Sequence, residues 1–250
     1  MKHLRWFFRT VAFLTIIPIG KLDAPGRDFS PCLPYFPVVG FLIGCLMAAV
    51  FPWLDRLIPG LAAGIILVVM WEMLTGGIHL DGLADTADGL FSRRPRERKL
   101  EIMRDSRIGA MGAAALWAVL ALKSAALAAV PPPVIVPYLV FAAASGRWAM
   151  VWAITFFPYA RTEGAGSIFH GERLVPAAAA ASLFWAAAGL WLLRLPGALI
   201  ILPAVVLLNH MLCIFLKSRL GGLTGDTYGA LCQVMEVWVL LLGSVLTRML

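Results

Sequence analysis

The sequence predicts an all-α fold, a polytopic integral membrane helical bundle of about seven transmembrane helices. Composition is the first observation: 61% of the 250 residues are hydrophobic and only 14% are charged, far from the balance of a soluble domain. The second is a series of apolar runs near the length that crosses a ~30 Å hydrocarbon core, separated by Gly, Pro or charge. Because no polar segment is long enough to fold alone, residues 1–250 are expected to form a single domain.

Each apolar run is a predicted membrane crossing, because about 20 helical residues span the bilayer core. The runs are Pro37–Leu54, Leu61–Thr75, Ala110–Val130, Tyr138–Phe157, Val175–Leu193, Ala198–Leu216 and Gly229–Thr247. The N-terminal stretch Trp6–Ile19 is short and stops at Pro18. It is therefore expected to be interfacial or re-entrant, with an eighth crossing left open.

The distribution of Lys and Arg predicts the orientation, because cytoplasmic loops of membrane proteins hold the excess of positive charge. With a cytoplasmic N-terminus, 16 of the 21 basic residues fall inside. The net charge of +7 is then explained by topology, and no nucleic-acid partner is expected. The sequence predicts a multi-pass protein of the cell (inner) membrane whose polar segments His79–Gly109, Tyr159–Leu174 and Lys217–Tyr228 share the cytoplasmic face.

Three aspartates form the strongest local pattern. Asp81, Asp85 and Asp88 stand at i, i+4 and i+7, which places three carboxylates on one helix face over a rise of ~10 Å. Like charges at this spacing repel each other unless a cation neutralises them. A solvated acidic face would usually include Lys or Glu, whereas Gly, Leu, Ala and Thr lie between these aspartates. The pattern predicts a site for Mg²⁺, or Mn²⁺, because the ligands are hard oxygens.

A second charged row follows, with a four-residue repeat that predicts another helix. Its members are Arg93, Glu97, Glu101 and Asp105. For Glu97 a solvated helix with i,i+4 ion pairs is sufficient. Asp105 lies between Arg104 and Arg107, so it is expected to complete the metal site while the two arginines hold phosphates.

Asp85-Thr-Ala-Asp88-Gly89, followed by Ser92-Arg93, resembles the opening of the CDP-alcohol phosphotransferase signature, with Ser in place of Ala. The second half of that signature, with its later pair of aspartates, is absent from this sequence. A phospholipid synthase of this kind is therefore the alternative hypothesis. A small-molecule transporter is a further alternative, because charges inside spans also mark transport paths. The absence of an internal repeat and the gathering of polar motifs at one face favour an enzyme.

A closer resemblance covers nearly the whole chain. The blocks that carry it are Tyr35-Phe-Pro-Val-Val-Gly40, His79-Leu-Asp-Gly-Leu-Ala-Asp-Thr-Ala-Asp-Gly89, Leu100-Glu-Ile-Met-Arg-Asp-Ser-Arg-Ile-Gly109, Tyr159-Ala-Arg-Thr-Glu-Gly-Ala-Gly166 and Gly221-Gly-Leu-Thr-Gly-Asp-Thr-Tyr-Gly-Ala230. They resemble the cobalamin (5′-phosphate) synthase family, also called adenosylcobinamide-GDP ribazoletransferases. The resemblance implies that α-ribazole, or its 5′-phosphate, attacks adenosylcobinamide-GDP and releases GMP. Gln233 departs from the family pattern, which often has two glutamates three residues apart, so a ligand role at that position is in doubt.

Roles for the remaining polar residues follow as expectations. Mg²⁺ held by Asp81, Asp85, Asp88 and Asp105 would bridge the diphosphate, and Asp88 or His79 would accept the ribose hydroxyl proton. Further expected substrate contacts are Arg104, Arg107, Arg161, Asp226, Glu236 and Arg147. Bland alternatives stay open: positive-inside charge for the arginines, a structural role for His79, and a helix cap for Asp226. Glu72 is expected to line the pocket and Lys123 to snorkel toward the outer face. Membrane lipid is an expected partner, and a homo-oligomer stays open.

Overall fold

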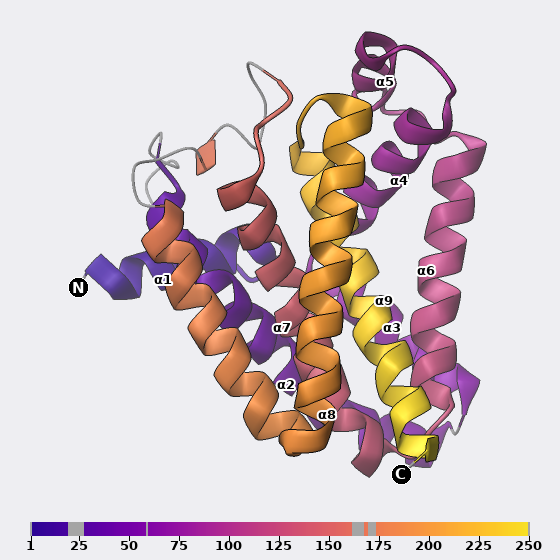
Figure 1. Cartoon of the computed structure of the whole chain (residues 1–250). Helices are drawn as coiled ribbons and strands as arrows, with labels where there is room; N and C mark the ends of the chain where they lie inside the picture. The colour runs from indigo at the N-terminus through magenta and orange to yellow at the C-terminus, as the bar shows by residue number, and fades with distance from the viewer. Residues whose placement is uncertain (1, 20–27, 59, 162–167, 170–173, 250) are drawn as a thin grey trace.

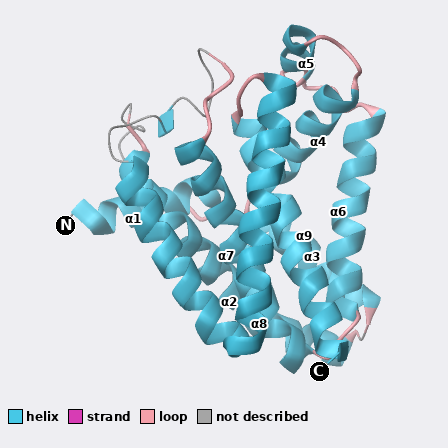
Figure 2. Ribbon diagram, in the orientation of Figure 1, coloured by secondary structure: helices cyan, strands magenta, loops and turns pink. Residues whose placement is uncertain are grey.

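The computed structural model confirms the all-helical fold and describes residues 2–19, 28–58, 60–161, 168–169 and 174–249. Within these residues the only β contact is an isolated bridge between Tyr159 and Leu223, and Figure 2 draws no strand. The elements are α1 Lys2–Leu14, the short 3₁₀ helix η1 Ser30–Tyr35, α2 Phe36–Leu57, α3 Leu61–Leu74, α4 Ile78–Phe91, α5 Arg96–Ile102, α6 Ala110–Ala128, α7 Pro132–Phe156, α8 Leu174–Leu220 and α9 Gly225–Met249.

Helix α7 is the centre of the bundle and is buried along nearly all of its length. Its strongest contacts are with α2 and α9. Gly40 and Gly44 of α2 allow the close approach, because a Cβ on them would lie 2.4 Å from the Ala143 carbonyl oxygen and 2.6 Å from the Val140 Cα. Small residues four apart commonly form such contacts between membrane helices, where van der Waals packing replaces the hydrophobic effect.

Among the described residues, five helices are long and apolar enough to cross a membrane, and six if the bent pair α3 and α4 counts as one span. This number of candidate spans includes α8 only once, although α8 breaks at Arg194, where the backbone has φ 56° and ψ 169°. Figure 1 shows the two parts of α8 running in opposite directions from this break. They correspond to the predicted runs Val175–Leu193 and Ala198–Leu216. A total of about seven crossings stays a prediction.

The predicted run Leu61–Thr75 is not a complete straight crossing. Helix α3 has 14 residues, about 21 Å of helix at 1.5 Å per residue, which is shorter than the ~30 Å core. The chain then bends by 95° into α4. Gly76 and Gly77 make the bend, with φ values of 65° and 68° that side chains with a Cβ rarely adopt. The acidic motif therefore lies on a separate helix at the end of a broken one.

Helix α1 agrees with an interfacial segment. Its 13 residues measure about 20 Å, too short to cross a bilayer core, and it is not among the candidate spans of the described residues. One face carries the buried residues Thr10 and Leu14. Figure 1 shows α1 running across the bundle instead of along it.

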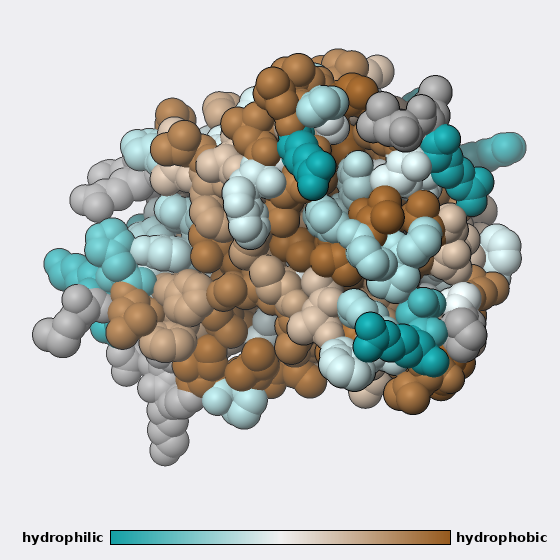
Figure 3. All heavy atoms as spheres, turned by 90° about the horizontal axis from the view of Figure 1, so that it is seen from below, coloured by the Kyte–Doolittle hydropathy of each residue, from teal (hydrophilic) through white to brown (hydrophobic). Residues whose placement is uncertain are grey.

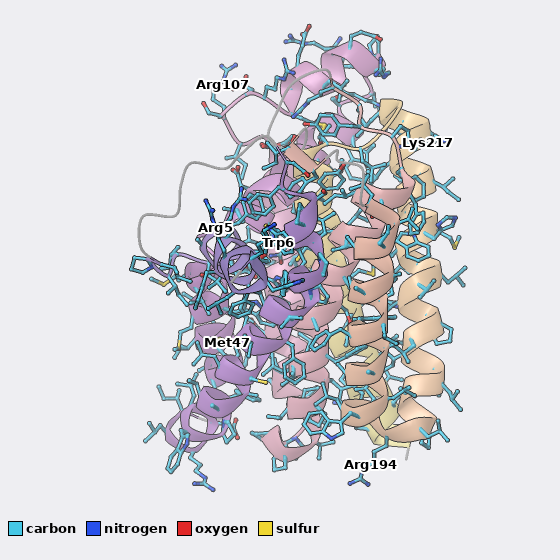
Figure 4. The ribbon with its side chains drawn as sticks, turned by 90° about the vertical axis from the view of Figure 1, so that its left-hand side faces the viewer. Arg5, Trp6, Met47, Arg107, Arg194 and Lys217 are labelled. Carbon is cyan, nitrogen blue, oxygen red and sulfur yellow. The ribbon has the colours of Figure 1, made fainter. Side chains whose placement is uncertain are left out.

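The three polar segments gather at one end of the bundle, as predicted. Arg96, the first residue of α5, donates from Nε to the Leu220 carbonyl at 2.7 Å and from a second guanidinium nitrogen to the Ala160 carbonyl at 3.3 Å. The Ala160 amide also donates to the Leu223 carbonyl at 2.7 Å. Residues 162–167 and 170–173 of the second segment lie outside the described residues. Figure 4 shows Arg107 and Lys217 near this end and Arg194 at the other.

The opposite end is chemically plain. Figure 3 looks at it directly and shows mainly hydrophobic residues with a few separate hydrophilic ones. The sequence predicts only three basic residues on this side, namely Arg56, Arg194 and Arg248. One end of the bundle therefore holds the chemistry-bearing segments.

A buried charge network joins four helices below the polar end. Lys123 of α6 donates to Glu72 of α3 at 2.7 Å, to the side-chain oxygen of Gln233 at 2.6 Å, and to Glu236 of α9. Glu236 also accepts from Arg147 of α7. Lys123 is fully buried and its ammonium lies 4.7 Å from the centre of the Trp71 ring. The expectation that Lys123 snorkels outward is wrong, because three oxygen acceptors hold it inside.

We predict that Lys123→Met lowers stability by about 3–5 kcal/mol, because removal of one partner leaves buried carboxylates without a counter-charge. The double variant Lys123→Met/Glu72→Gln should recover part of this loss, since it restores charge balance. Thermal unfolding in detergent, followed by tryptophan fluorescence, measures both. The matched control is Lys217→Met, because Lys217 is exposed and should unfold like the parent. Equal unfolding of the Lys123 and Lys217 variants would contradict a stabilising network.

Candidate active site

Helix α4 carries the acidic motif as predicted. Asp81, Asp85 and Asp88 all lie between its ends at Ile78 and Phe91. Asp81 is exposed, and Asp85 and Asp88 are half-buried. The residues between them, such as Leu83 and Ala87, are buried. The helix therefore directs its apolar side into the bundle and its carboxylates toward the polar end.

Helix α9 packs closely against α4 through two glycines. A Cβ on Gly82 would lie 2.6 Å from the Asp226 carbonyl oxygen, and one on Gly229 would lie 3.1 Å from the His79 Cα. Contacts this short exclude any larger side chain at Gly82 without a shift of the backbone. Because α9 begins at Gly225, its first turn faces the middle of α4. The contact thus brings Asp226 beside the aspartates of α4.

Asp226 does not cap α9. Thr224 has that role, because its hydroxyl oxygen accepts the Thr227 amide at 3.3 Å while the Thr227 hydroxyl oxygen accepts the Thr224 amide at 2.8 Å, a reciprocal capping box. The Asp226 carboxylate instead pairs with Arg161 at 3.0 Å. The guanidinium Nε of Arg161 is buried and has no hydrogen-bond partner within the described part of the chain. Asp226 therefore has no capping role and is available as a site residue, in agreement with the substrate contact that was expected as the alternative to a helix cap.

Negative charge accumulates where α4 meets α9. The charge on Asp85 is repelled by Asp81, Asp226 and Asp88, and Arg161 provides the opposing attraction. Among the described residues no three His, Cys, Asp or Glu side chains already form a group that could hold a metal ion. The donor chemistry nevertheless fits a hard cation, because the converging groups are carboxylates and one arginine does not balance them.

Asp88 has a different set of partners from Asp85. Its two carboxylate oxygens accept the backbone amides of Gly109 at 2.7 Å and Gly112 at 2.8 Å. These amides belong to the N-terminus of α6, where the cap residue Gly109 has no side chain of its own. Asp88 therefore caps a neighbouring helix, at the end where the helix dipole attracts an acidic side chain. Both oxygens of Asp88 thus hold the start of α6 in place, and its expected role as proton acceptor stays a prediction.

Asp105 lies in the loop between α5 and α6. It does not extend a long charged helix, because α5 covers only Arg96–Ile102 and Arg93 has a positive φ of 55°. The expected four-residue row is therefore wrong as a single helix. Asp105 pairs with Arg107 at 2.6 Å, and hydrogen bonds from Arg107 lower the pKa of Asp105 to about 2. Arg104 is exposed. A metal-ligand role for Asp105 stays a prediction.

Two of the expected substrate contacts belong to the buried network. Arg147 and Glu236 are fully buried and paired with each other. Neither residue lines the two cavities at the acidic contact described below, and their expected contact with substrate stays a prediction. Glu72 is also in the network and lines neither of these two cavities. His79 is 1% exposed and lies on the opposite side of α4 from the solvent.

Two cavities adjoin at the acidic contact, and Ile78 and Asp81 line both. The first, of about 400 Å³, is bordered by Gly76, Gly77, Asp85 and Ile108, among others. The second, of about 290 Å³, lies between α4, α9 and the aromatic side chains of Phe13 and Phe169. We call these the acidic cavity and the aromatic cavity. Asp81 is thus the carboxylate that separates two sites of different chemistry.

Sequence reasoning missed several of these residues for identifiable reasons. Phe13 and Phe169 come from segments far apart in the chain, and an isolated Phe in an apolar sequence has no distinguishing signal. Arg96 was counted only as positive-inside charge, although it ties α5 to the end of α8. Gly82 was the one feature of the sequence that indicated close packing of α4, because a glycine inside a helix often marks a place where another segment packs closely.

The fold and this site define a class: a multi-pass, helical membrane protein with carboxylates from two helices and an arginine gathered at one end. A comparison with protein families then gives the particular family. The model for cobalamin-5-phosphate synthase matches residues 6–244, and the chain belongs to this family.

Curated relatives agree with this assignment. A protein of Desulforamulus reducens is 44% identical over 93% of this chain and 93% of its own length. A protein of Roseiflexus sp. (strain RS-1) is 46% identical over 90% of this chain and 84% of its own length, and one of Acetivibrio thermocellus is 36% identical over 97% and 98%. Each of them is named adenosylcobinamide-GDP ribazoletransferase. No solved structure matches the chain.

We predict that Gly82→Ala abolishes most of the activity attributed to this site, because its Cβ would lie 2.6 Å from the Asp226 carbonyl and must push α9 away from α4. Gly197→Ala is the matched control, since the nearest atom to its Cβ is 3.5 Å away, an ordinary contact. The measurement is turnover at matched amounts of folded protein. The close-packing account fails if both variants keep the parental rate.

Proposed function

We propose that this chain is an adenosylcobinamide-GDP ribazoletransferase in cobalamin biosynthesis. Its reaction is phosphoryl-group transfer. A ribose hydroxyl of α-ribazole, or of its 5′-phosphate, forms a new O–P bond to the phosphorus attached to cobinamide. The P–O bond to GMP breaks, GMP leaves with the bonding electrons, and the hydroxyl proton passes to a base. The observation that carries the proposal is the meeting of Asp81, Asp85 and Asp226 with Arg161 between two cavities.

The acidic contact is proposed as the site of a divalent cation, Mg²⁺ or Mn²⁺. Asp85 and Asp226 are the proposed ligands because they lie on facing helices and their charges repel each other. When bound, such a cation supplies neutralisation of the diphosphate charge. Asp88 has the separate task of fixing the start of α6, the helix that contributes Leu116 to the acidic cavity.

Asp81 is the proposed proton acceptor, in place of Asp88. It lines both cavities, so it can contact a hydroxyl in one and a phosphate in the other. It is also exposed and makes no hydrogen bond with its side chain to a described residue. A general base must lie within hydrogen-bond reach of the proton that it removes, and the place of Asp81 at the border of both cavities supports this role.

The arginines are proposed to bind phosphate. Arg161 is the first candidate because it faces the carboxylates and its Nε has no partner among described residues. Arg104 is exposed on the preceding loop, whereas Arg107 is already paired with Asp105. Planar guanidinium groups suit the bidentate binding of phosphate oxygens.

The membrane setting completes the proposal. The excess of Lys and Arg at the polar end favours a cytoplasmic location for the site in the cell (inner) membrane. The substrates would then reach the acidic contact from the cytoplasm, with α1 lying at the lipid interface. Apolar residues such as Leu183 and Trp191, both 74% exposed, are proposed to face lipid.

The direct test is release of GMP by purified protein supplied with adenosylcobinamide-GDP, α-ribazole and Mg²⁺. We expect turnover that EDTA abolishes and Mg²⁺ restores. Asp85→Asn and Asp226→Asn should each lower kcat by about 100-fold or more, as loss of a group that stabilises transition-state charge does. Glu97→Gln is the matched acidic control, because Glu97 is exposed at 74%.

Each arm of this experiment has an outcome that counts against the proposal. Full activity in EDTA would refute metal dependence. Release of CMP from CDP-diacylglycerol and a small alcohol, without release of GMP, would favour the phospholipid synthase alternative. Near-parental rates for both Asn variants would place the chemistry elsewhere.

A further inference from the structure

The aromatic cavity has walls that differ in kind from those of the acidic cavity. Phe13 of α1 and Phe169 form one side, with their ring centres 5.6 Å apart in an edge-to-face arrangement. Met150 of the central helix also lines it. The opposite side consists of α4 and α9, which contribute His79, Asp81 and Asp226. The cavity therefore has an apolar, aromatic side and a polar side.

The two phenylalanines are held in place by other rings. Phe169 contacts Phe29 and Phe36 at ring-centre distances of 5.5 Å and 5.9 Å, and Phe13 contacts the same two rings. Edge-to-face and tilted contacts of this kind stabilise ring orientation. A flat ligand entering the cavity would thus meet rings that are already ordered.

His79 provides an independent sign that the cavity takes a polar ligand. It is 1% exposed, and neither ring nitrogen has a hydrogen-bond partner among the described residues. Buried polar groups are almost always hydrogen bonded, so an unpartnered one requires an explanation. Since His79 lines the cavity, a bound ligand can supply the missing partner. A neutral imidazole has one N–H donor, which suits a ligand with one ring-nitrogen acceptor.

We propose that the aromatic cavity binds the heterocyclic base of the attacking nucleoside, stacked on one of the two rings Phe13 and Phe169 and in edge-to-face contact with the other, and hydrogen bonded through its free ring nitrogen to His79. This inference rests on the proposed function, because it assigns one of that reaction's two substrates to one of the two cavities. The attached sugar would extend toward Asp81 at the border of the acidic cavity. There its hydroxyl meets the phosphate-binding side.

Size and polarity favour this base over the other candidates. About 290 Å³ is at the small end of ligand pockets, which span ~300–1,000 Å³, so the cavity suits a bicyclic base and excludes a corrin ring. Guanine is also bicyclic, but its edge carries several donors and acceptors. The walls formed by Phe13, Met150 and Phe169 offer none of these, and the carboxylates of the polar side, Asp81 and Asp226, are the groups that the proposed function uses for the proton and the cation. A benzimidazole nucleoside, with one free nitrogen on an apolar ring, matches the cavity better.

The test is steady-state kinetics of GMP release with each substrate varied in turn. Phe169→Leu and, as a second variant, Phe13→Leu should raise the KM for α-ribazole about tenfold, equivalent to ~1.4 kcal/mol. The KM for adenosylcobinamide-GDP should stay within about twofold. Phe215→Leu is the matched control, because Phe215 lines a separate apolar cavity between α4 and α8. Equilibrium binding of α-ribazole alone should weaken in parallel.

The outcomes separate this inference from the proposed function. An inactive parent protein would refute the function itself. An active parent whose Phe169 and Phe13 variants raise the KM for adenosylcobinamide-GDP, or strengthen or weaken inhibition by GMP, would assign the cavity to guanine and overturn the inference. Unchanged KM values for both substrates in both variants would overturn it as well. Restoration of α-ribazole binding by Phe169→Tyr would support stacking on a ring.

Discussion

The close contact between α4 and α9 is the constraint on which the site depends. Gly82 and Gly229 let the two backbones approach until Asp226 lies beside the aspartates of α4. This approach concentrates more negative charge than Arg161, the cation that opposes it among the described residues, can balance. Close packing therefore brings together carboxylates whose charges repel each other, and a bound cation would neutralise this repulsion. The bend at Gly76 and Gly77 also makes this contact possible, because it lets α4 run in a different direction from α3.

The buried charge network beneath this contact has no net charge. Two cations, Lys123 and Arg147, face two carboxylates, Glu72 and Glu236. Gln233 donates to both oxygens of Glu72 at 3.2 and 3.0 Å and accepts from Lys123. An uncharged side chain here keeps the network balanced, whereas a glutamate would add an unpaired charge, which is costly in a buried setting. A glutamine at position 233 thus has a structural explanation.

Periodicity and composition predicted much of the fold and the first part of the site. Helical spacing was sufficient for Asp81, Asp85 and Asp88, because local geometry alone puts them on one helix. It could not reveal that Asp88 caps α6, since that depends on two backbone amides more than 20 residues away. Hydropathy also could not tell whether Lys123 snorkels toward the outer face or is buried. The break of α3, the partners of Arg147 and Glu236, and the aromatic cavity all depend on contacts between distant segments.

The central claim is that carboxylates from α4 and α9 together hold one divalent cation. Electron paramagnetic resonance of Mn²⁺ added to the detergent-purified protein measures this directly, without substrate. The account predicts saturable binding that Mg²⁺ displaces, weakened about tenfold or more by either Asp85→Asn or Asp226→Asn, because each removes a hard oxygen ligand. Glu97→Gln should bind like the parent. Parental Mn²⁺ affinity in the Asp226→Asn variant would contradict the account, since α9 would then contribute nothing to the site.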